Sequence, residues 1–123
     1  MASKVKSLNL RANRLTYISD EALYDLKILQ MLNLADNQLA ALPPAVFNKS
    51  LALEELHLQN NSLTLVTSEL FTGLTNLVHL NLSYNAISSH LLSSDTFGGL
   101  VSLKVLDLSF NRITKIAPDL FAR

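Results

Sequence analysis

One phrase of eleven residues recurs five times along this chain, and this recurrence constrains the fold more than any other feature of the sequence. In the frame LxxLxLxxNxL the copies begin at Val5, Leu29, Leu53, Leu77 and Leu103. The asparagines of the phrase stand at 13, 37, 61, 85 and 111, so the period is 24 residues, and 26 for the last interval. A period of this length is typical of architectures in which each copy forms one coil of a solenoid.

Apolar and polar side chains alternate within each phrase, which predicts a short strand. Leu8 and Leu10 should face one side of that strand, whereas Ser7 and Asn9 face the other. A single strand cannot bury its leucines alone, but copies stacked roughly 4.8 Å apart form a parallel sheet with a continuous core. The core should then hold the equivalent leucines of the inner coils, namely Leu34, Leu58 and Leu82.

The five phrases resemble the leucine-rich repeat family, and the resemblance covers essentially the whole chain. It implies an α/β fold: a curved right-handed solenoid, with a parallel β-sheet on the concave face and short helical or 3₁₀ turns on the convex face. It also implies that each inward asparagine bonds backbone groups of the turn in its own coil and the next. We expect a single domain spanning residues 1–123, with five repeats starting near 5, 29, 53, 77 and 103 and no capping domains.

A second apolar column and two departures from the repeat complete the pattern. The column predicts a packed spine under the convex side, made of Leu23, Phe47, Phe71, Phe97 and Phe121. In the fourth coil two extra residues should bulge near 88–93, either as a tolerated loop insertion or as a partner contact. In the second coil Ser50 occupies a column that Leu26, Leu74 and Leu100 fill elsewhere.

Composition excludes several classes of function. Ten basic and ten acidic residues give a formal net charge of 0 without a basic run, so we expect no nucleic acid and no anionic membrane surface as partner. Without cysteine there is no disulfide framework and no thiolate metal site. The sequence has no apolar run of about 18 residues, and its start lacks the apolar stretch of a secretory signal. Because no nucleophile or acid–base pair falls in an evident pocket, we expect neither an enzyme nor a cofactor.

The sequences of the repeats resemble those of extracellular members of the family. The run "LNLSYNAISSHLLSSDTFGGLVSLKVLDLSFNRI" resembles the ectodomain of insect-type Toll receptors, whereas "NQLAALPPAVF" resembles lamprey variable lymphocyte receptors as well. The resemblance implies a run of internal repeats from a membrane-anchored parent at the extracellular face of the plasma membrane. The implied role is recognition of a protein ligand or a second receptor chain. The alternatives are repeats that only space the receptor, or a binding fragment of another extracellular leucine-rich repeat protein.

Side chains that point away from the core are free to bind a partner. They form four stripes across the sheet: Ser7, Met31, Glu55, His79 and Val105; Asn9, Asn33, His57, Asn81 and Asp107; Arg11, Ala35, Gln59, Ser83 and Ser109; Ala12, Asp36, Asn60, Tyr84 and Phe110. Adjacent aromatic residues are favoured anchors at interfaces, although they also pack on one another. A metal held by the histidines is the weaker alternative to a solvated polar face. The candidate protein-binding residues are Glu55, His57, His79, Tyr84, Asp107 and Phe110.

Two further expectations concern the surface. Three sequons make Asn48, Asn60 and Asn81 candidates for N-glycosylation, and a sugar on Asn81 would cover the centre of the sheet. A solenoid without polar caps exposes its leucine core at both ends, so we expect self-association through the first and last coils.

Overall fold

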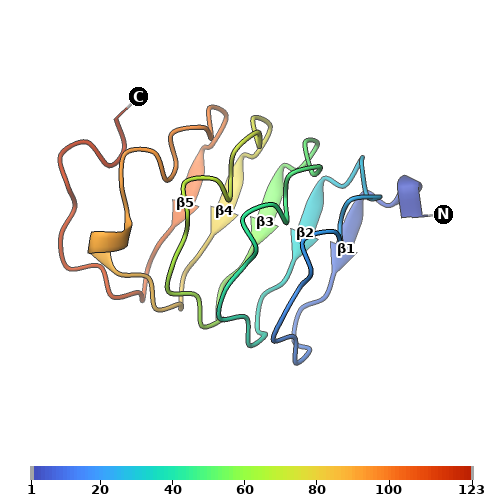
Figure 1. The fold of residues 1–123 in the computed structure, drawn as a ribbon, viewed down its shortest axis with the longest axis horizontal. Helices are drawn as coiled ribbons and strands as arrows, with labels where there is room; N and C mark the ends of the chain where they lie inside the picture. The colour runs from blue at the N-terminus through green and yellow to red at the C-terminus, as the bar shows by residue number, and fades with distance from the viewer. Residues whose placement is uncertain (1, 123) are drawn as a thin grey trace.

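The computed structural model describes residues 2–122 of the chain and shows one sheet of five short parallel strands in sequence order. Each strand opens one coil, and successive coils lie side by side with the two termini at opposite ends of the molecule (Figure 1). The elements are η1 (Ala2–Lys4), β1 (Ser7–Asn9), β2 (Met31–Asn33), β3 (Glu55–His57), β4 (His79–Asn81), η2 (Ser89–Leu91) and β5 (Val105–Asp107). The leucine-rich repeat solenoid expected from the period is confirmed.

The register of the sheet repeats the register of the sequence. Leu8 pairs with Leu32, Leu32 with Leu56, and Leu56 with Leu80, so equivalent positions of successive repeats are neighbours. The inward leucines form the core, as predicted: Leu34, Leu58 and Leu82 are at most 1% exposed. Each coil therefore supplies one wall of its neighbour's core, and neither coil is stable without the other.

The asparagine column ties neighbouring coils together through backbone groups. Asn37 Nδ2 donates to the carbonyl of Leu34 in its own coil at 3.0 Å and to that of Leu10 in the preceding coil at 3.1 Å, while its Oδ1 accepts from Leu15 N–H at 3.0 Å. Asn61, Asn85 and Asn111 repeat this set of bonds. The expectation that each asparagine bonds the next coil was wrong. The second coil that it bonds is the preceding one, whose turn places a carbonyl and an N–H group beside the amide.

On the side opposite the sheet the chain forms hydrogen-bonded turns. Their N–H groups donate to the carbonyl three residues earlier, as in Ala22 to Ser19 and Leu26 to Leu23. This is the bond of a 3₁₀ turn, and the 3₁₀ helix η2 precedes the turn of the fourth coil. The predicted apolar spine lies under the turns, where Phe97 stacks between Phe71 and Phe121 with ring centroids 6.3 and 6.5 Å apart.

The last coil has a neighbour on one side only, and its inward leucines are less buried than their equivalents in the fourth coil. Leu80 and Leu82 are 0% exposed in the fourth coil, whereas their equivalents in the fifth coil are only half-buried. Phe121 is 56% exposed. Together with Leu106 and Leu108 it lines an apolar cavity of about 410 Å³ at that end. None of the helices described is long and apolar enough to cross a membrane.

We predict that Asn37→Ala lowers the free energy of unfolding by about 3 kcal/mol, because it removes side-chain bonds to backbone groups of two coils and leaves the Leu15 N–H unpaired. Asn13→Ala is the matched control, since Asn13 is exposed and its side chain makes a single bond, to Leu10 O at 2.9 Å. That control should cost less than about 1 kcal/mol. Urea denaturation of the two variants measures both values. Equal costs would show that the bonds between coils contribute nothing beyond the turn.

We propose that the chain self-associates through its open ends, and we predict oligomers at high micromolar concentration in sedimentation velocity. Phe121→Glu places a charge on the apolar surface of the last coil and should shift the distribution towards monomer. Leu65→Glu, at an exposed apolar residue of the third coil that does not line this cavity, is the control and should leave the distribution unchanged. A folded wild-type monomer at every concentration contradicts the proposal.

Candidate protein-binding surface

Three of the candidate residues meet on β3 and β4. Glu55 pairs with His79 in the register of the sheet, and the rings of His57 and His79 lie 5.2 Å apart at 51°. His57 Nε2 lies 3.2 Å from Glu55 Oε2. Within residues 2–122, no three His, Cys, Asp or Glu side chains are grouped as a metal site requires. The cluster is thus a polar, partly charged patch at the centre of the outward sheet face.

The stripe that runs from Asn9 to Asp107 has a local structural role that was not predicted from the sequence. The Oδ1 atoms of Asn9, Asn33 and Asn81 each accept the backbone N–H two residues further on at 3.0 Å. Asp107 does the same for Ser109, with bonds of 2.9 Å from its N–H and 2.6 Å from its hydroxyl. These two bonds lower the pKa of Asp107. Short Asn and Asp side chains favour such turns, so the column itself was a usable signal.

The fourth stripe was wrongly placed on the strands. Its members lie in the turn after each strand, with positive φ values of 60, 57, 55, 55 and 56° for Ala12, Asp36, Asn60, Tyr84 and Phe110. Asn and Asp tolerate this left-handed conformation, whereas it costs other L-residues roughly 1–2 kcal/mol. The third stripe is not uniformly outward either, because Ala35 and Ser83 are buried at 0% and 4% exposed.

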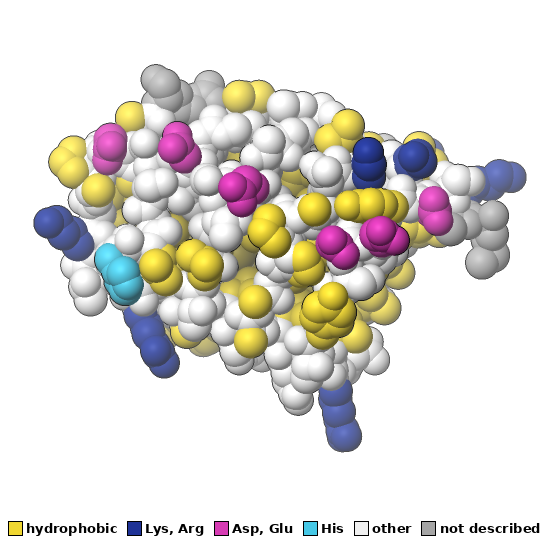
Figure 2. Space-filling view, in the orientation of Figure 1, with side chains coloured by type: hydrophobic (Ala, Val, Ile, Leu, Met, Phe, Trp, Pro, Cys, Tyr) yellow, Lys and Arg dark blue, Asp and Glu magenta, His cyan; other side chains and the backbone are white. Residues whose placement is uncertain are grey.

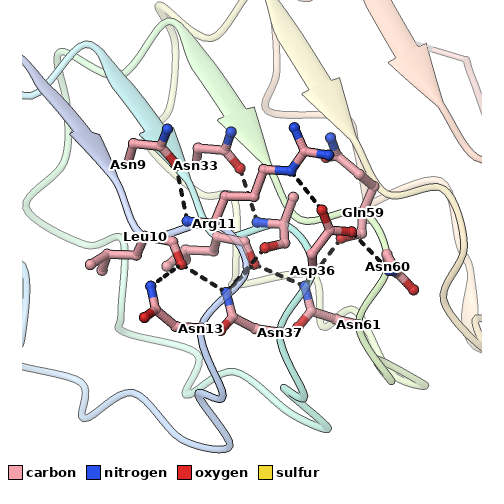
Figure 3. A network of polar contacts seen from close by, with 12 residues as sticks. Asn9, Leu10, Arg11, Asn13, Asn33, Asp36, Asn37, Gln59, Asn60 and Asn61 are labelled. Atoms are coloured by element: carbon pink, nitrogen blue, oxygen red, sulfur yellow. Dashed lines mark hydrogen bonds and ion pairs between the residues drawn. The ribbon is translucent and has the colours of Figure 1, made fainter.

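In the turns that follow β1, β2 and β3, a polar network joins the first three coils (Figure 3). Arg11 Nε donates to Asp36 Oδ2 at 2.6 Å, and Asn60 Nδ2 donates to Asp36 Oδ1 at 2.8 Å. The hydrogen bonds from Arg11 and then Asn60 lower the pKa of Asp36. Both charged groups are thereby paired, so this end of the stripe offers a partner little unsatisfied charge.

At the other end of the stripe lie the two aromatic candidates. The rings of Tyr84 and Phe110 stack with centroids 4.3 Å apart and planes inclined by 9°. They remain 53% and 69% exposed. Tyr84, Asn60, Asp36 and Gln59 line a depression of about 450 Å³ beside the pair. Gln59 Oε1 is buried there and has no hydrogen-bond partner within the described residues.

The three sequon asparagines lie in different surroundings. Asn48 is exposed in the turn opposite the sheet, and Asn60 is exposed in the turn after β3. Asn81 is half-buried on the sheet face, with its Oδ1 bonded to Ser83 N–H and Oγ.

Comparison with known families and structures agrees with this architecture. The sequence pattern of the family described as Leucine rich repeat matches residues 3–61 and 51–113, so the chain belongs to the leucine-rich repeat family. Families with this fold typically serve as protein-interaction modules. The comparison with curated proteins gives no significant match.

Solved structures similar to the chain include the APL1 leucine-rich repeat domain (31% identity, 96% of this chain and 32% of that one, TM-score 0.86). A glycosylated form of the Toll–Spätzle complex from Drosophila matches with 29% identity over 91% of this chain and 15% of that one, TM-score 0.87. A leucine-rich repeat protein of Leptospira interrogans matches with 35% identity over 90% of this chain and 27% of that one, TM-score 0.79. The chain thus spans 15% to 32% of the length of these three, and resembles a Toll ectodomain over a few coils.

Proposed function

We propose that this chain is a protein-recognition module from a Toll-like receptor ectodomain, and that the stacked pair of Tyr84 and Phe110 is its central anchor. The observation that carries the proposal is the combination of exposure and backbone strain at both residues. Two large apolar rings are held in the left-handed region, where Asp36 and Asn60 stand in other coils. Strain of this kind persists when the surroundings impose it, and it gathers at binding sites.

The neighbourhood of the pair suits a protein partner. Stacking fixes both rings before binding, so a partner loses little side-chain entropy when it covers them. The adjacent depression presents the exposed side chain of Asn60 to a partner. The solved Toll relative is in complex with Spätzle, which supports a protein as the partner class here. The role proposed is binding without catalysis, on a parent at the extracellular face of the plasma membrane.

Glycosylation of Asn48 is a second part of this proposal, and it rests on Ser50. The Ser50 side chain is 1% exposed, and its hydroxyl has no partner among the described residues. The equivalent Leu74 and Leu100 are buried and apolar. Burying an unpaired hydroxyl costs about 1–3 kcal/mol, so the core alone gives no reason for serine at this position. The sequon that starts at Asn48 requires it.

We predict that Tyr84→Asn with Phe110→Asn weakens binding of the full receptor to its protein ligand by about 30-fold or more, as expected for two aromatic anchors. Asparagine suits the left-handed turn, so the free energy of unfolding should change by less than about 1 kcal/mol. Surface plasmon resonance and urea denaturation measure the two effects. Val101→Asn removes an exposed apolar side chain elsewhere and is the control. Unchanged affinity would favour the spacer alternative.

We predict that Ser50→Ala stabilises the unglycosylated protein by about 1 kcal/mol and abolishes the glycan on Asn48. Urea denaturation of bacterially produced protein measures the first effect, and glycopeptide mass spectrometry of material secreted by eukaryotic cells measures the second. Ser50→Thr keeps the sequon and should keep the glycan. A bare Asn48 in secreted wild-type protein contradicts the assignment.

A further inference from the structure

The fourth and fifth coils enclose a groove of about 590 Å³ on the flank that follows the asparagine turns. Its lining includes Ser89, His90, Leu92, Arg112, Thr114 and Lys115. The groove lies between two coils and takes no part in the open end of the solenoid. Its volume is that of a site for a few residues of peptide.

The two-residue insertion of the fourth coil builds one wall of this groove. The lengthened segment contains η2, and Ser88 pairs with Arg112 in a parallel bridge outside the main sheet. Ser89 Oγ accepts the N–H of Thr114 at 2.7 Å and of Lys115 at 3.2 Å. The bulge predicted near 88–93 is therefore present, and it is tied to the next coil by backbone and side chain. At the equivalent place the second and third coils carry Ala41 and Leu65, which have no hydroxyl to make these bonds.

The charge on this flank has one sign. The segments 14–18, 38–44, 62–67, 86–93 and 112–117 contain no Asp or Glu, although the chain has ten acidic residues. Figure 2 views this flank: the acidic side chains lie across the upper part of the face, and the lower part shows basic and hydrophobic side chains. Within residues 2–122 the ion pairs are Arg11 with Asp36 and His57 with Glu55, so Arg112 and Lys115 have no acidic partner.

We propose that this groove binds an acidic, extended peptide segment of a protein partner. Carboxylates of the segment pair with Arg112, whose guanidinium donates to two oxygens at once, and with Lys115. An apolar side chain of the segment packs against Leu92 and Ala117 in the same groove. This apolar lining favours a peptide over a sulfated polysaccharide, which would leave Leu92 uncovered.

The inference deepens the proposed function, on which it rests in taking a protein as the occupant. The groove begins two residues beyond Phe110, so one partner can contact the aromatic pair and the groove together. The two sites remain separable, because the groove is tested with a peptide that does not require the aromatic pair.

The experiment measures fluorescence anisotropy of a labelled Glu-Glu-Leu-Glu-Glu peptide with the 123-residue chain at low ionic strength. We expect saturable binding that weakens as salt screens the charges, and no binding of the same peptide with Gln in place of Glu. Arg112→Gln should weaken binding about tenfold or more. Arg14→Gln removes the same charge from the equivalent position of the first coil and should have little effect. Ser89→Ala should weaken binding at unchanged net charge by releasing η2.

Four results overturn the proposal: no saturable binding of the Glu peptide, equal binding of the Gln peptide, equal loss in Arg14→Gln and Arg112→Gln, or tighter binding of a heparin oligosaccharide that Arg112→Gln abolishes. Circular dichroism of each variant separates loss of the site from loss of the fold. Failure here leaves the Tyr84–Phe110 anchor standing, since that site is measured in the full receptor with its own ligand.

Discussion

The asparagine amide at the end of each strand is the contact on which the rest of the structure depends. A parallel sheet of three-residue strands has few ladder bonds of its own, and its coils could slide relative to one another. The amide prevents this by donating to carbonyls of two coils and accepting an N–H from the preceding one, as Asn37 does. Because every group it bonds is a backbone group, the coil keeps its path whatever side chains cover its surface. Surface residues are then free to vary for binding.

The same contact explains how the strained turn persists. Tyr84 and Phe110 each precede a ladder asparagine, and Tyr84 N–H continues the ladder by donating to Ser109 O at 3.0 Å. Releasing the left-handed torsion would break these bonds, so the aromatic residues keep a conformation that Asn or Asp adopts more readily. The turn thus fixes both rings in place. A rigid aromatic pair on an open surface has lost its conformational freedom during folding, before any partner arrives.

The repeat pattern predicts which side chains are buried, but it does not predict which atoms each asparagine bonds. Leu34, Leu58 and Leu82 were predictable because alternation and period leave only one face for them. The direction of the Asn37 bonds was not, since a bond to either neighbouring coil gives the same column of asparagines. The left-handed turn had a signal in Asp36 and Asn60, which favour that torsion, but Tyr84 and Phe110 in the same column obscured it. The capping role of Asn9 and Asn33 was missed because an outward amide resembles a free surface residue.

The fourth coil is two residues longer than the others, and this insertion has an energetic consequence. Lengthening a surface loop by two residues costs little if the loop stays disordered. Here the inserted residues are ordered by the Ser88–Arg112 bridge and the bonds of Ser89 Oγ, so the chain has lost their conformational entropy as well. Those bonds compensate the loss without adding to the leucine core. An ordered insertion that builds a groove with unpaired basic residues has its clearest physical use in contact with something outside the coil.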